Sequence, residues 1–288
     1  MMMFDWTIPG AVAQPIIGTT HVPDCDVCGH VVIAHGFKGY KDYGMFPCLA
    51  HQFAAHGFVA HRFNFSHSGM TNEVATFARP DLFKRDTWNH QVHDLRAVTS
   101  AVREGTLPGG HNSGPIVLFG HSRGGVTVLL TVGRAAADES FPQPTGVITA
   151  AAPASTCSLD EEQKQALRQN GFLQSPSSRT GQTLRIGREW LEEQEADPQS
   201  HDLLNLIPNI DVPLLIVHGE DDPTVDPASA RIIADAATSA EAHVVMIRGA
   251  NHVFNTPNPF PADQILGGGL AALVDAAVSF ARQCVGVA

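Results

Sequence analysis

The sequence predicts an α/β fold in which a mostly parallel, doubly wound sheet is covered by helices on both faces. Two patterns indicate this fold: strand-like apolar runs alternate with stretches of helical period, and the strand runs are continuously apolar. Continuous runs are typical of strands buried on both faces, because the crossover helices of a parallel sheet cover each side. The working residues of such a sheet lie on loops at the carboxyl ends of its strands.

The individual elements follow from where each pattern begins and ends. The predicted strands are apolar runs bounded by Gly, Pro or Asn, at His30–His35, Phe58–Phe65, Pro115–Gly120, Gly146–Ala151, Val212–His218 and His243–Ile247. The predicted helices are Met45–His56, Trp88–Glu104, Gly124–Ala137, Ala228–Ala237 and Leu270–Arg282. The segment from Phe4 to about Thr20 alternates apolar residues around Pro9-Gly10, which favours a short antiparallel hairpin at the sheet edge.

One connection is much longer than a single crossover. About sixty residues separate the strand that ends near Ala152 from the strand that starts at Val212. This segment, about 153–208, is polar, but anchors such as Trp190 give it apolar surface to bury, which favours a small cap of short helices over a flexible linker. Because 288 residues with 43% hydrophobic content can bury a full core, we expect one domain over residues 1–288 with the cap inserted in it.

The charge balance limits the partners of the chain. Its 18 Lys and Arg against 29 Asp and Glu give a formal net charge of -11, which repels nucleic acid and anionic lipid surfaces at long range. The N-terminus carries Asp5 where a signal peptide needs positive charge, and no apolar run is long enough to span a bilayer. We therefore expect a cytoplasmic protein whose partner is a small molecule, with no nucleic acid or membrane partner, and a homodimer as an open alternative.

The cysteines and the familiar cofactor motifs favour a protein without metal or cofactor. Five cysteines are an odd number, and their wide spacing fits reduced thiols. The segment from His21 to His30 holds two histidines and two cysteines, which could in principle supply four zinc ligands, but one short cluster lacks the paired spacing of structural zinc sites. A surface turn is the favoured interpretation. No nicotinamide fingerprint, phosphate-binding loop or HExxH helix is present in the sequence.

A candidate nucleophile lies at a predicted strand-to-helix junction. The residues Gly120-His121-Ser122-Arg123-Gly124 match the G-x-S-x-G pattern directly after the strand PIVLFG and before the apolar helix VTVLLTV. A sharp turn there forces strained backbone on the serine, and the flanking glycines are needed where a Cβ would collide. The pattern predicts that Ser122 is a nucleophile; the alternative is a glycine-rich turn with a solvated serine.

Two backbone amides are candidate donors to an oxyanion. Amides at the N-terminus of the following helix favour developing negative charge, which indicates the Arg123 amide. The sequence HGFKG ends an earlier strand and can aim the Phe37 amide at the same crevice. The alternative interpretation of HGFKG is a simple turn.

A serine nucleophile also needs a base and an acid, each just past a later strand. His252 lies on a loop after the strand HVVMI, whereas His243 lies inside a strand and His218 at a strand end. The chain order Ser, Asp, His is the one that this kind of site uses when the nucleophile lies in G-x-S-x-G.

The spacing of the sequence does not identify a single aspartate as the acid. Asp226 precedes Pro227 at the start of a predicted helix and fits a helix N-cap. That leaves Asp221 and Asp222, which spacing alone does not separate.

These motifs resemble those of the α/β-hydrolase superfamily, more closely its dienelactone-hydrolase-like and cinnamoyl-esterase-like branches. The resemblance spans most of the chain and is carried by HGFKGYKDYG, GFVAHRFNFSHSG, GHSRGG, the SSRTGQ stretch near Arg179, HGEDDPTV and GANHVFNTPNPF. It implies the α/β-hydrolase fold, and within HGxxDxxV and GANH it assigns the acid to Asp222 and the base to His252. Dienelactone hydrolases proper use a cysteine nucleophile where this chain has Ser122, so the resemblance does not imply a dienelactone substrate.

The hypothesis is therefore a cofactor-free serine hydrolase of the carboxylesterase type that forms an acyl-enzyme on Ser122. A small soluble ester is expected, because the inserted segment is short and polar, unlike the broad apolar lids of lipases. Two alternatives remain. One is acyl transfer or peptide cleavage by the same triad of Ser122, Asp222 and His252, and the other is a non-catalytic ligand-binding protein built on the same fold.

Overall fold

The computed structural model describes residues 1–109, 114–136, 138, 140–261 and 266–287. Within these residues, one sheet has eight strands in the order β1-β2-β4-β3-β5-β6-β9-β10. Its strands are β1 (Met2–Pro9), β2 (Pro15–Val22), β3 (Gly29–Ala34), β4 (Phe58–Asn64), β5 (Ile116–His121), β6 (Gly146–Ala150), β9 (Leu214–Gly219) and β10 (Ala242–Ile247).

The sheet is parallel from β4 to β10, and an antiparallel hairpin extends it at one edge. Strands β4, β3, β5, β6, β9 and β10 pair in parallel, whereas β2 pairs antiparallel with both β4 and β1. This confirms the predicted parallel sheet and the predicted N-terminal hairpin. Each of the six strands predicted from apolar runs is present, with ends that differ by at most two residues.

Helices cover both faces of the sheet and explain its continuous apolar runs. Helices α1 (Met45–Ala55) and α10 (Gly268–Cys284) pack on one face, and α3 (Trp88–Arg103), α4 (Arg123–Ala135) and α9 (Ala228–Ala236) pack on the other. In β5, Leu118 joins the core beneath α3 and α4, while Val117 and Phe119 join the core beneath α1 and α10. Ala137, where the sequence predicted the end of the helix after Ser122, lies outside the described residues.

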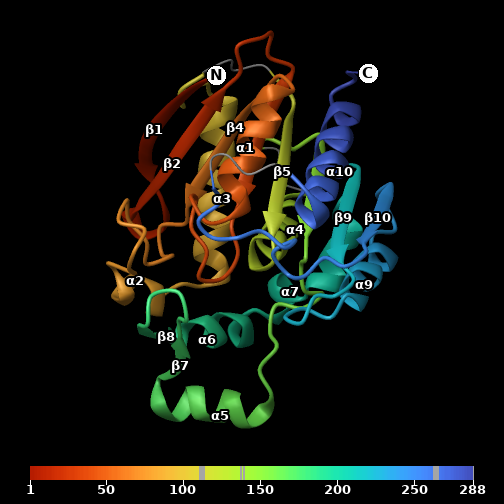
Figure 1. Ribbon diagram of the computed structural model, residues 1–288. Coiled ribbons are helices and arrows are strands. Elements are labelled where there is room, and N and C mark those ends of the chain that lie inside the picture. The colour runs from red at the N-terminus through yellow and green to blue at the C-terminus, as the bar shows by residue number, and fades with distance from the viewer. Residues whose placement is uncertain (110–113, 137, 139, 262–265, 288) are drawn as a thin grey trace.

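The long connection between β6 and β9 contains both helices and a hairpin. Its elements are α5 (Glu161–Asn170), β7 (Phe172–Pro176), β8 (Thr183–Gly187), α6 (Glu189–Ala196), α7 (Pro198–His201) and α8 (Leu203–Leu206). In Figure 1, α5, α6 and the β7–β8 pair lie at the end of the molecule opposite both chain termini, the end toward which the arrow of β5 points. Trp190 is buried in the core beneath α3 and α4, so this segment packs on the rest of the chain.

The β7–β8 hairpin was not predicted from the sequence, which indicated only short helices here. The two strands pair antiparallel from Phe172–Gly187 to Pro176–Thr183. Contacts with a distant segment hold the hairpin: the Gln182 side chain accepts a hydrogen bond from the Phe77 amide (2.8 Å) and donates one to the Phe77 carbonyl (3.2 Å). Helix α2 (Pro80–Lys84) packs beside β8. Such long-range partners leave no periodic signal in the local sequence.

Along the described part of the chain, we find no helix with the length and apolar character that crossing a membrane requires.

Candidate active site

Ser122 lies on the sharp turn between β5 and α4, and its backbone is strained. Its φ of 53° and ψ of -122° are unusual for a residue with a side chain. A Cβ built on Gly120 would lie 2.3 Å from the Gly124 carbonyl oxygen, and one built on Gly124 would lie 2.4 Å from the Ala34 carbonyl oxygen. The prediction that both positions require glycine is therefore confirmed.

The predicted base and acid reach the serine from two later strands. The Ser122 hydroxyl lies 3.1 Å from Nε2 of His252, which follows β10. On the other side of the ring, Nδ1 of His252 lies 2.8 Å from Oδ2 of Asp222, which follows β9. The imidazole thus bridges the hydroxyl and the carboxylate, with both separations in the range of hydrogen bonds.

The structure brings Asp222 to His252 and leaves the neighbouring Asp221 exposed. The other carboxylate oxygen, Oδ1 of Asp222, accepts hydrogen bonds from the amides of Thr224 (2.8 Å) and Val225 (3.0 Å). Burial raises the pKa of Asp222, but these bonds and the one from His252 outweigh it, so the net pKa lies below the usual value. Asp222 is therefore held as an anion.

Asp226, the remaining acid of this loop, serves the following helix. Its carboxylate accepts a hydrogen bond from the Ala228 amide (2.9 Å) at the start of α9. The sequence predicted Asp226 as the N-cap, whereas the N-cap of α9 is Pro227, one residue later, and Asp226 contacts the first residue of the helix from just outside it.

His218, which the sequence indicated only as a histidine at a strand end, contacts the acid Asp222. Its Nε2 lies 3.1 Å from Oδ2 of Asp222 and 3.2 Å from the Val225 carbonyl oxygen, and its side chain is fully buried. Because both neighbours accept hydrogen bonds, Nε2 must carry the proton, which leaves Nδ1 unprotonated and without a hydrogen-bond partner. Burial lowers the pKa of His218, which agrees with a neutral ring.

His121, the residue before the serine, supports the His252 loop. Its Nε2 donates a hydrogen bond to the His252 carbonyl oxygen (2.8 Å), and the two rings lie 5.0 Å apart. Burial, together with the nearby imidazole of His252, lowers the pKa of His121 to about 3, so the ring is neutral near pH 7. The only sequence signal for this role is the position of His121 inside G-x-S-x-G.

The residues that carry the two predicted oxyanion donors lie close to Ser122. Gly36 and Ser122 lie so close that a Cβ built on Gly36 would be 3.0 Å from the Ser122 Cβ, which places the loop that carries Phe37 beside the nucleophile. Arg123 opens α4, and its guanidinium lies 4.6 Å from the Trp88 ring centre and 3.4 Å from the Asp86 carboxylate. The oxyanion role of the Phe37 and Arg123 amides stays a prediction.

A cavity of about 220 Å³ opens over the serine. It is lined by the loop after β3, by the turn between β7 and β8, and by the residues around the nucleophile and the base: Gly36, Phe37, Lys38, Gly39, Tyr43, Phe46, His121, Ser122, Pro176, Ser177, Ser178, Arg179, His252 and Val253. The cavity is smaller than sites for drug-sized ligands, which occupy about 300–1,000 Å³.

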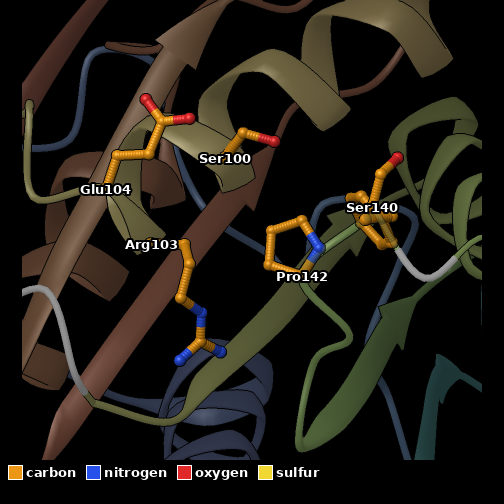
Figure 2. Close-up of a pocket in the computed structure, with 6 residues that line it drawn as sticks. Ser100, Arg103, Glu104, Ser140 and Pro142 are labelled. Carbon is orange, nitrogen blue, oxygen red and sulfur yellow. The ribbon is translucent and has the colours of Figure 1, made fainter.

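A second cavity, of about 310 Å³, lies at the opposite end of the sheet (Figure 2). In Figure 2, Ser100, Arg103 and Glu104 lie on one side and Ser140 and Pro142 on the other. Arg103 donates a hydrogen bond to the Gly114 carbonyl oxygen just before β5, whereas the nucleophile follows the other end of that strand. None of the residues that line this cavity is a histidine or a cysteine, so its serines lack the chain of contacts to a histidine and an aspartate that Ser122 has.

The histidines and cysteines weighed as zinc ligands do not converge. His21 is buried in β2, where its Nε2 accepts a hydrogen bond from Arg62 (2.9 Å), whereas Cys25 is exposed. Across the described ranges, no group of three or more His, Cys, Asp or Glu side chains is arranged to hold a metal ion.

The sheet is mostly parallel, a serine lies on the strained turn after β5, and an acid and a histidine follow β9 and β10. Together these features define the α/β-hydrolase class of protein. The chain belongs to the alpha/beta hydrolase family, whose sequence pattern matches residues 31–264. This membership and the resemblance to esterases confirm the relationship inferred from the motifs.

Individual relatives are distant but cover nearly the whole chain. A monoacylglycerol lipase from Mycolicibacterium smegmatis is 24% identical over 269 residues, covering 84% of this chain and 88% of that protein. Est1E from Butyrivibrio proteoclasticus superposes with a TM-score of 0.69 at 15% identity and 98% and 99% coverage of the two chains. A dienelactone hydrolase from Anabaena variabilis superposes with a TM-score of 0.58 at 14% identity and 98% and 99% coverage. The structural likenesses show the shared fold, and the named relatives support an enzyme of the hydrolase kind.

Proposed function

We propose that this protein is a serine esterase that cleaves a small carboxylic ester through an acyl-enzyme on Ser122. The observation that carries the proposal is the continuous hydrogen-bonded chain from the Ser122 hydroxyl through His252 to Asp222, with heavy-atom distances of 3.1 and 2.8 Å. In this arrangement Asp222 fixes the tautomer of His252, so that Nε2 is free to accept the serine proton.

The first step forms the acyl-enzyme. The Ser122 oxygen attacks the ester carbonyl carbon while its proton passes to Nε2 of His252, and the carbonyl oxygen becomes an oxyanion held by the Phe37 and Arg123 amides. Collapse of this intermediate breaks the bond to the alkoxy oxygen. The leaving alcohol takes the proton from His252 and departs.

The second step releases the acid. Water gives a proton to Nε2 of His252 and attacks the acyl carbon, and the bond to the Ser122 oxygen breaks as the proton returns to that oxygen. The products are a carboxylic acid and the free serine, and no group other than this chain and water takes part.

The names of the relatives support an ester substrate, and the size of the cavity supports a substrate of modest size. A volume of about 220 Å³ suits a short acyl or alcohol group. The connection between β6 and β9 contributes Pro176, Ser177 and Ser178 to the cavity lining, which supports its interpretation as a cap over the site within a single domain.

The test is turnover of 4-nitrophenyl acetate by the wild type and by Ser122→Ala. Removing the nucleophile is expected to lower kcat by about 10⁴-fold or more, with a matched Ser100→Ala variant, in the second cavity, as the control that keeps wild-type turnover. Equal turnover by the wild type and Ser122→Ala would refute the proposal.

The alternatives give different results in related assays. Acyl transfer would appear as a new ester or amide product when an alcohol or amine competes with water, and peptide cleavage as turnover of amide substrates. A non-catalytic protein would leave every ester intact. A cytoplasmic location, a small-molecule partner and, as an open alternative, a homodimer remain predictions from the sequence.

A further inference from the structure

The cavity over Ser122 is positively charged in a protein whose net charge is strongly negative. The side chains of Lys38 and Arg179 line it, and no Asp or Glu is among its lining residues. The whole chain, by contrast, carries 29 acidic against 18 basic residues. The lining of the cavity therefore carries the opposite charge to the chain as a whole.

Neither cation is neutralised by an acid of the described chain. Arg179 donates from Nη1 to the Val74 carbonyl oxygen (2.5 Å) and from Nη2 to the Met70 sulfur (3.4 Å), and has no carboxylate partner. A guanidinium has five N–H donors, so the two used here leave three for a ligand or water.

Aromatic rings fix the Arg179 guanidinium in place. Its central carbon lies 4.6 Å from the Tyr40 ring centre and 4.9 Å from the Phe77 ring centre. Contacts of a cation with ring faces are attractive and hold the planar group in one orientation. The guanidinium is thus positioned before any ligand binds, which lowers the entropic cost of binding.

Lys38 is the second cation and joins the two walls of the cavity. Its Nζ donates a hydrogen bond to the Pro176 carbonyl oxygen (2.6 Å), so it links the loop after β3 to the end of β7. Burial without a counterion lowers the pKa of Lys38. A bound anion would relieve that cost.

The turn that carries Arg179 is well fixed. The Ser177 amide donates a hydrogen bond to the Gln182 carbonyl oxygen (2.8 Å), and the Gly181 amide donates one to the Ser177 carbonyl oxygen (2.9 Å). Arg179 therefore lies on a rigid turn at the edge of the cavity that contains Ser122.

We propose that Lys38 and Arg179 form an anion subsite that binds a carboxylate of the substrate, so that the ester cleaved at Ser122 is itself an acid. The inference rests on the proposed esterase function and adds a substrate class to it. A carboxylate fits because its two oxygens match the planar donor fork of a guanidinium. The carboxylate belongs either to the acyl part or to the alcohol part of the ester.

Two pairs of substrates, each an acid and its neutral methyl ester, test the subsite and distinguish these two sources. The first pair is mono(4-nitrophenyl) glutarate and its methyl ester, in which the charge lies on the acyl part. The second pair is 4-acetoxybenzoate and its methyl ester, in which the charge lies on the alcohol part. The readout is the ratio of kcat/KM for the acid to kcat/KM for its methyl ester.

We expect a ratio of about 10 for one of the two pairs in the wild type, which corresponds to one charge-assisted contact. Arg179→Gln should bring that ratio close to 1, and Lys38→Gln should lower it. The control is Arg185→Gln, because Arg185 lies on the same hairpin, is exposed and does not line the cavity; this variant should keep the wild-type ratio. A ratio isolates charge recognition, because damage to folding lowers both rates together.

A ratio near 1 for both pairs in the wild type, or one that Arg179→Gln leaves unchanged, would overturn the subsite. If the neutral esters are still cleaved in that case, the esterase function survives. If no ester of either pair is cleaved, and the wild type and Ser122→Ala also turn over 4-nitrophenyl acetate equally, the proposed esterase function itself fails.

Discussion

His218 provides a sharp test of how the acid of the triad is held. Asp222 accepts four hydrogen bonds, two on Oδ1 from the amides of Thr224 and Val225 and two on Oδ2 from His252 and His218. The bond from His218 is the longest at 3.1 Å, and its proton is shared with the Val225 carbonyl oxygen. We expect His218 to be a positioning residue that keeps Oδ2 aimed at His252.

The size of the effect follows from these contacts. A hydrogen bond to a charged group is worth about 1.5–3 kcal/mol, and a shared bond lies at the lower end of that range. If about 1.5 kcal/mol is lost in the transition state, His218→Leu lowers kcat by about tenfold, because 1.36 kcal/mol corresponds to a factor of ten. The folded state also loses stability, since the Val225 carbonyl loses a buried partner.

The assay separates positioning from general damage in three ways. KM for 4-nitrophenyl acetate should stay near the wild-type value while kcat falls, and His218→Gln, whose amide can still donate, should recover part of kcat. In an Asp222→Asn background, His218→Leu should cost little more, because the two residues act through one carboxylate. An undiminished kcat in folded His218→Leu, or an equal loss in both backgrounds, would show that His218 does not position the Asp222 carboxylate.

Three further predictions concern the acid, the nucleophile turn and the response to pH. Asp222→Asn should lower kcat by about 10⁴-fold through the wrong His252 tautomer, while the exposed neighbour Asp221→Asn should keep wild-type kcat; the reverse result would reassign the acid. Gly124→Ala should lower the free energy of unfolding in urea by about 1–3 kcal/mol, because its Cβ would lie 2.4 Å from a backbone oxygen of β3, whereas Gly267→Ala, with no atom within 4 Å, should change it little. Burial lowers the pKa of four histidines from 6.5 to about 4, or to about 3 in one case: His21, His35, His67 and His121. As the pH falls below the pKa that these histidines have in the unfolded chain, the unfolded chain takes up protons that the folded chain does not. The free energy of unfolding is therefore fully retained above that pKa and decreases as the pH falls toward the lower pKa of the folded state. Between pH 7 and about pH 5.5 this amounts to about 1 kcal/mol per histidine, and equal urea midpoints at the two pH values would contradict it.

The parallel sheet and the triad geometry could be predicted because both depend on local patterns in a fixed order. Strand β5 reads as an apolar run, and Gly120 and Gly124 mark the turn that no larger residue fits. Because parallel strands end at the same edge, residues after β5, β9 and β10 were expected to converge, and the distances from His252 to Ser122 and Asp222 agree. The choice of Asp222 over Asp221 came from the resemblance to a family, since adjacent residues have the same spacing.

Side chains that act through long-range contacts could not be predicted. The sequence pattern places His218 at the end of a strand. Its contact with Asp222 depends on how the loop after β9 turns back, and the apolar periodicity of the sequence carries no information about that turn. Arg179 reaches the cavity that Lys38 also lines only through the β7–β8 hairpin, and that hairpin contacts Phe77, which is far away in the sequence. In both cases the physical cause is tertiary packing that overrides weak local preferences.

The proposed mechanism depends on Ser122 acting as a nucleophile that His252 activates. Its most direct test is to treat the folded protein with a fluorophosphonate and locate the added mass by peptide mass spectrometry, with His252→Ala as the comparison. We expect one adduct, on Ser122, that forms far more slowly in His252→Ala. No adduct on Ser122, or equally fast labelling with and without His252, would contradict it.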